Sequence, residues 1–170
     1  MYFFKYIYAM KYLKISFGIF LVLALSRFIP HPPNFTNLLA LSFYVPLIFG
    51  LNFIPIVILS FLLTDLYFGF HSSVFFTWGS VAIIGYISIY FKNSLSKRLL
   101  GAASAAIIFF ILSNFGVWIS GGYGYTLNGL ISCYILAIPF FGNTFVSTII
   151  YSALIELIYK IYNTRFQREG

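Results

Sequence analysis

Acidic residues are nearly absent from this sequence, and charge of either sign is scarce. Of its 170 residues, three are Asp or Glu and ten are Lys or Arg, so charged residues make up 8%, against about 25% in a typical soluble domain. Between Arg27 and Lys92 the ionisable side chains are those of Asp65, two histidines and several tyrosines. Water cannot be the solvent for so long an uncharged stretch, which excludes a soluble globular protein.

Cysteine and the common catalytic patterns are also rare or missing. Cys133 is the single cysteine, which excludes an intrachain disulfide and a cysteine-based zinc site. The sequence has no His-Glu-x-x-His pattern, no Gly-x-Ser-x-Gly elbow, no phosphate loop and no paired carboxylates. His31, Asp65 and His71 have no recognisable metal-ligand spacing. We therefore expect no catalytic residues, no cofactor and no metal site.

What the chain does contain is hydrophobic sequence of helical length. Hydrophobic residues make up 61% of it, and the mean hydropathy is +0.97. Lipid admits only helices or closed barrels, and barrel strands would alternate polar with apolar residues, so we expect an all-α integral membrane protein with a single domain, 1–170. The first apolar run has no small-residue cleavage site after it, so we expect a retained helix and not a removed signal peptide.

The apolar runs predict six transmembrane helices and one shorter helix. The six spans are expected at about 12–28, 37–50, 53–69, 73–90, 99–119 and 143–162. Residues 127–140 are short for a span and contain Pro139, so we expect a re-entrant or surface helix on the outer side. A turn at residues 50–52 separates the second and third spans. One kinked helix from Asn37 to Phe70 is the alternative.

The basic residues lie in short clusters between the apolar runs, which is a sign of membrane orientation and not of a nucleic-acid surface. With a turn at 50–52, three clusters fall on one side of the membrane: Lys5, Lys11 and Lys14; Lys92, Lys97 and Arg98; Lys160, Arg165 and Arg168. Of the ten basic residues, Arg27 alone falls on the other side. Because cytoplasmic loops carry the excess of Lys and Arg, we expect both termini in the cytoplasm and no nucleic-acid partner.

Residues 27–36 gather residue types that the chain otherwise has little of: an arginine, a histidine, three prolines and an asparagine. By helix rise, Arg27 and Asp65 would both lie roughly 5–8 Å below the outer surface. A charge at that depth is costly unless it is paired or hydrated, so we expect an Arg27–Asp65 ion pair. The pair is either a structural link between the first and third helices or part of a ligand-binding site.

Other polar and aromatic residues are expected at the same end of the bundle, and with the ion pair they form the predicted substrate-binding set. The set is Arg27, His31, Asn34, Asp65, His71, Trp78, Asn114, Trp118, Tyr123, Asn128 and Asn143. Any one tryptophan or tyrosine can instead belong to an interfacial aromatic belt, and Asn34 and Asn128 can be turn or cap residues. The outward N-termini of the second, fourth and sixth helices would favour a polar or anionic group.

Several segments resemble the signature of an uncharacterised bacterial family of membrane proteins thought to act in transport. They are Arg27; Pro30-His31-Pro32-Pro33-Asn34-Phe35-Thr36; Asp65 with Gly69-Phe70-His71; Ser113-Asn114-Phe115-Gly116-Val117-Trp118; and Ile138-Pro139-Phe140-Phe141-x-Asn143-Thr144. Gly142 stands where an arginine is common in that family. The chain is also similar in size and helix number to the substrate-binding subunits of energy-coupling factor transporters.

That second resemblance implies an outward-facing site for a vitamin-like solute, with a transmembrane coupling protein and ATPases as partners. Helix 1 has Gly18, Ala24 and Ser26 but not the alanine pair common in that group. We therefore expect a small-molecule uptake subunit in the bacterial inner membrane. A membrane scaffold or accessory subunit is the first alternative. An intramembrane enzyme using Ser72 or Ser73 beside His71 is the second.

Overall fold

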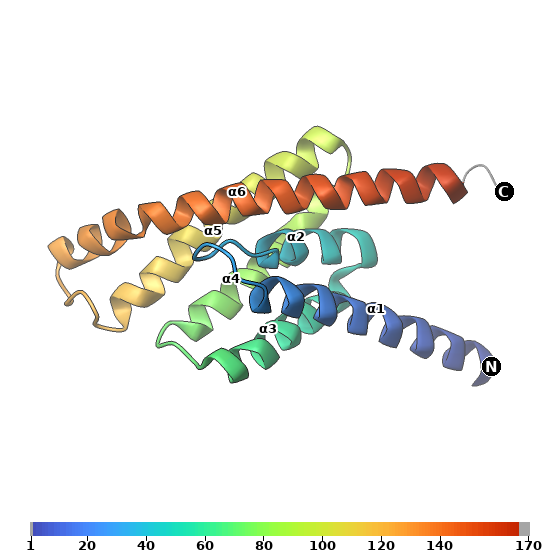
Figure 1. The fold of residues 1–170 in the computed structure, drawn as a ribbon, viewed down its shortest axis with the longest axis horizontal. Coiled ribbons are helices and arrows are strands. Elements are labelled where there is room, and N and C mark those ends of the chain that lie inside the picture. The colour runs from blue at the N-terminus through green and yellow to red at the C-terminus, as the bar shows by residue number, and fades with distance from the viewer. Residues whose placement is uncertain (1, 167–170) are drawn as a thin grey trace.

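The computed structural model describes residues 2–166 of the chain as a bundle of helices without a strand (Figure 1). The helices are α1 (Tyr2–Phe28), α2 (Leu38–Phe49), α3 (Ile54–Phe68), α4 (Val74–Ile87), α5 (Leu95–Ile119) and α6 (Leu127–Phe166), with short 3₁₀ helices at Leu51–Phe53 and Ser88–Phe91. Successive helices alternate in direction along the long axis. The start of α1 and the end of α6 therefore lie at the same end of the bundle, at the right in Figure 1. We call this the terminal end and the opposite one the far end.

Long apolar helices indicate that the protein is embedded in a membrane. Within the described residues, four segments are long and apolar enough to cross a bilayer: Leu51–Phe68, Val74–Phe91, Leu95–Ile119 and Leu127–Thr164. Helix α2 is a shorter apolar helix, and it is buried along most of its length. Many large apolar side chains on the other helices are exposed, in a number that only lipid or another apolar partner would cover.

The predicted turn after α2 is present, and the single kinked helix from Asn37 to Phe70 is wrong. Gly50 has φ +100°, a conformation that glycine adopts without the steric cost of a Cβ atom. Its N–H donates to the carbonyl of Pro46 at 2.9 Å, which ends α2. The chain then reverses through one 3₁₀ turn, and Pro55 stands in the first turn of α3, where its missing N–H costs little.

The predicted separation of residues 127–140 from a helix at 143–162 is wrong. Both segments belong to α6, one continuous helix of 40 residues with Pro139 inside it. At about 1.5 Å per residue this helix is roughly 60 Å long, about twice the hydrocarbon thickness of a bilayer. A proline removes one helical hydrogen bond, but neighbouring helices and hydroxyl side chains can compensate in a membrane protein. The two pieces together therefore form a single candidate span, Leu127–Thr164.

A bidentate ion pair joins α5 to α6 toward the terminal end. Arg98 donates from Nε to Glu156 Oε1 at 2.6 Å and from Nη2 to Glu156 Oε2 at 2.8 Å, and its Nη1 donates to the Lys92 carbonyl at 3.2 Å. The i,i+4 spacing of Glu156 and Lys160 would favour a pair within α6. Glu156 instead pairs with Arg98 of the neighbouring helix.

Small residues let α5 pack closely against α2 at the centre of the bundle. Ala102, Ala105 and Ala106 are fully buried. A Cβ atom at Gly101 would lie 2.5 Å from the ring of Phe43 and 2.7 Å from that of Phe91. The small-residue face of α5 is therefore internal packing.

This packing predicts that Gly101→Val destabilises the protein, since overpacking a filled site costs about 1–3 kcal/mol. Gly18→Val on α1 is the matched control, because a Cβ atom there meets nothing within 4 Å. Thermal unfolding in a mild detergent measures both variants. Equal losses at the two positions would contradict the packing argument.

Candidate functional site

The predicted ion pair between α1 and α3 is confirmed. Arg27 Nη1 lies 2.6 Å from Asp65 Oδ1, and Asp65 is 1% exposed. The second carboxylate oxygen, Oδ2, accepts a hydrogen bond from Trp78 Nε1 of α4 at 3.0 Å. Both oxygens of Asp65 therefore have a donor, and one buried carboxylate links three helices.

The Arg27 guanidinium is bound on one side and unbound on the other. Besides Asp65, its Nη1 contacts the Thr64 hydroxyl and, at 3.4 Å, the Phe61 carbonyl. Its carbon lies 4.6 Å from the ring centre of Phe61 and 5.1 Å from that of Phe68. Nε and Nη2 make no hydrogen bond within the described residues. These N–H groups remain available to a ligand.

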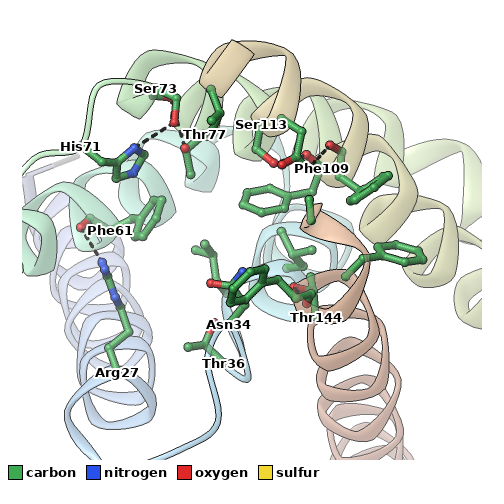
Figure 2. A pocket seen from close by; sticks show the side chains of 18 of the residues that line it. Arg27, Asn34, Thr36, Phe61, His71, Ser73, Thr77, Phe109, Ser113 and Thr144 are labelled. Carbon is green, nitrogen blue, oxygen red and sulfur yellow. Dashed lines mark hydrogen bonds between the residues drawn. The ribbon is translucent and has the colours of Figure 1, made fainter. Parts of the chain in front are cut away.

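A cavity of about 610 Å³ lies beside this ion pair (Figure 2). Its lining residues come from all six helices and from the segments between α1 and α2 and between α3 and α4. Arg27, Phe61 and His71 lie on one side of it in Figure 2, with Phe109 and Thr144 on the other. In Figure 1, α1 ends and α2 begins well short of the far end, which α5 and α6 reach. This difference in reach leaves room for the cavity.

Five residues of the predicted set line the cavity: Arg27, His31, Asn34, His71 and Asn114. Asp65 and Trp78 are not on its wall, but they hold Arg27 in place from behind. Neighbouring carbonyls orient two of the lining side chains. His31 Nδ1 donates to the Pro32 carbonyl at 2.7 Å, and Asn114 Nδ2 donates to the Phe110 carbonyl at 2.7 Å.

The remaining four predicted residues do not line the cavity. Asn143 donates to the Pro33 carbonyl at 3.0 Å. This bond fastens the proline segment, residues 29–37 between α1 and α2, to α6. Trp118 stacks near Phe115, and its buried Nε1 has no partner among the described residues. Tyr123 and Asn128 are exposed around the α5–α6 turn, which extends past the cavity at the far end (Figure 1).

The structure adds lining residues that the predicted set did not include. They are hydroxyl and phenyl side chains from every wall: Thr36, Phe61, Phe68, Ser72, Ser73, Thr77, Phe109, Phe110, Ser113, Phe140, Phe141 and Thr144. Those on α5 and α6 recur at three- and four-residue spacing, which places them on one helix face. That periodicity was the signal for them in the sequence, but the helices are so apolar that it is weak.

The expectation that three helix N-termini face the site holds for two of them. Leu38 and Leu39 of α2 and Ser73 and Thr77 at the start of α4 line the cavity. Helix α6 begins at Leu127 and reaches the cavity only at residues 137–144. The expected contribution of the α6 dipole is therefore wrong, because a helix dipole acts within the first turn.

His71 and Ser73 form a contact that bears on the enzyme alternative. His71 Nδ1 lies 3.1 Å from Ser73 Oγ, a nucleophile-to-base distance. A catalytic histidine usually has a third group that orients it, and no carboxylate contacts His71 among the described residues. Nor do three His, Cys, Asp or Glu side chains of the described chain come together as a metal site.

The fold and the cavity define a class: a membrane-embedded helical bundle with a polar and aromatic cavity between its helices. Within that class, the chain belongs to DUF6580, a family of unknown function, whose family model matches residues 9–169. Comparison with curated proteins and with solved structures gave no match.

The buried pair predicts strong coupling between Arg27 and Asp65. Removing one partner of a buried ion pair leaves an uncompensated charge and costs about 3–5 kcal/mol. We expect Asp65→Ala alone to be strongly destabilising, and the double variant Arg27→Ala with Asp65→Ala to lose less than the sum of the single changes. Thermal unfolding of all four proteins gives the coupling energy. Additive losses would show that the pair does not hold α1 to α3.

Proposed function

We propose that this protein is a membrane subunit that captures a polar small molecule outside the bacterial cell membrane and takes part in its uptake. The observation that carries the proposal is the cavity of about 610 Å³, a size within the roughly 300–1,000 Å³ of small-molecule sites. Hydroxyl, amide and imidazole groups from separate helices meet in it beside phenyl rings. Such a mixture provides apolar contact together with a few orienting hydrogen bonds.

The proposed orientation places the cavity on the outer side. In it, α1 to α6 are the six spans and both termini are cytoplasmic. Lys11, Lys14, Lys92, Lys97 and Lys160 lie on segments toward the terminal end, which supports this orientation because basic residues concentrate on the cytoplasmic side.

Energy for uptake would have to come from partners. The sequence has no phosphate loop for a nucleotide, and the fold is a single bundle. A transmembrane coupling protein with ATPases, as the resemblance to energy-coupling factor subunits implies, would supply that energy. In this proposal the subunit binds its solute without chemically changing it.

The orientation predicts the labelling of single cysteines introduced into a Cys133→Ser background. A membrane-impermeant maleimide should label cysteines at Asn34 and Tyr123 in intact cells, and a cysteine at Ser94 only after permeabilisation. Labelling of position 94 from outside, or of position 34 only from inside, would reverse the topology.

Filling the cavity should abolish solute binding. Ala137 lines the cavity on α6, whereas Ala153 is exposed on the same helix. We expect a small molecule to be retained by the wild-type protein and by Ala153→Trp, and lost from Ala137→Trp, when native mass spectrometry is applied after gentle extraction. Thermal unfolding checks that both variants fold.

If the wild-type cavity is empty and a stoichiometric partner protein copurifies, the uptake proposal is wrong and the scaffold alternative replaces it. Retention of the same solute by Ala137→Trp would place the binding site elsewhere in the protein.

A further inference from the structure

The unbound edge of Arg27 has a counterpart elsewhere in this protein. In the ion pair toward the terminal end, Arg98 donates from Nε and Nη2 to the two carboxylate oxygens of Glu156. At the cavity, the same two nitrogens of Arg27 make no hydrogen bond within the described residues, since Asp65 is held by Nη1. This Nε–Nη2 edge is the planar fork that binds a carboxylate through two parallel hydrogen bonds.

The charges around the cavity favour an acid over an amine. Among the described residues, no acidic side chain lines it. Asp65 is 1% exposed, and both of its oxygens are occupied by Arg27 and Trp78. A ligand ammonium would therefore find no free carboxylate. A ligand carboxylate would meet the Arg27 edge near the N-termini of α2 and α4, whose dipoles favour negative charge.

The opposite wall of the cavity is aromatic. Phe109 and Phe110 come from α5, and Phe140 and Phe141 from α6. Figure 2 shows Phe109 across the cavity from Arg27 and His71. A flat ring is well suited to this wall, because aromatic rings attract one another in edge-to-face and offset-stacked arrangements beyond the effect of the area they bury.

We propose that the solute carries one carboxylate, bound by Nε and Nη2 of Arg27, and an aromatic body that packs against the phenylalanines of α5 and α6. This assignment rests on the proposed function and specifies the class of its substrate. His31 and His71, which line the cavity with Arg27, provide further hydrogen-bonding groups beside the carboxylate.

Three probes that share the same phenyl ring and the same four-carbon chain, and differ only in the end group, test the carboxylate: 4-phenylbutyrate, 4-phenylbutanamide and 4-phenylbutylamine. Their binding to wild-type protein in nanodiscs at neutral pH can be measured by ligand-observed NMR titration. We expect the acid to bind at least about tenfold more tightly than the amide and the amine, the scale of a hydrogen bond to a charged group. Hexanoate, which lacks the ring, should bind more weakly than 4-phenylbutyrate.

Arg27→Lys keeps the positive charge and removes the fork, so it should abolish most of the preference for the acid. Arg98→Lys is the matched control, because it makes the same change at an ion pair that does not line the cavity. It should leave the preference unchanged, and thermal unfolding reports whether each variant folds.

Equal binding of acid and amide, tighter binding of the amine, or no binding of any probe would overturn the carboxylate assignment. So would a preference that survives Arg27→Lys. Those outcomes do not decide the proposed function, which depends on whether Ala137→Trp releases the copurified solute.

Discussion

The buried contact between Arg27 and Asp65 is the constraint on which the rest of this structure depends. A carboxylate that is 1% exposed in a membrane-embedded bundle is tolerable only if each of its oxygens has a donor. Arg27 from α1 and Trp78 from α4 provide those donors to α3. The charge that α1 carries near its end is thereby neutralised, and the proline segment after it begins at a fixed position beside α3 and α4.

That fixed position produces the cavity. Helix α1 ends at Phe28 and α2 begins at Leu38, and the segment between them forms one wall instead of continuing to the far end. Asn143 holds Pro33 against α6, while Asn37 accepts from Ser26 and donates to the Val22 carbonyl of α1. The wall is therefore attached to both sides of the bundle, which keeps it from collapsing into the space that the shorter helices leave.

The sequence was sufficient to predict a structural feature where physical cost allowed only one arrangement of the residues. Two opposite charges at matched depth predicted the ion pair, and the clustering of basic residues predicted the turn at Gly50. It was insufficient for α6, because Pro139 is compatible with both a break and a continuous membrane helix. Which it is depends on neighbours that the sequence does not show. Apart from Asn114, the lining residues of α5 and α6 were missed, since hydroxyl and phenyl side chains at helical spacing are equally compatible with lipid contact.

The wrong prediction of two separate helices in place of α6 also explains why part of the predicted substrate-binding set lies away from the cavity. With residues 127–140 as a separate outer helix, Asn128 would belong to that short element and Tyr123 to the loop just before it, both on the outer side near the site. With one helix from Leu127 to Phe166, the α5–α6 turn is carried past the cavity, and residues 137–144 take its place as the wall. A helix interior has no free N–H groups. Attraction for a negative group must therefore come from the other wall, where Arg27 keeps two of its nitrogens free of Asp65.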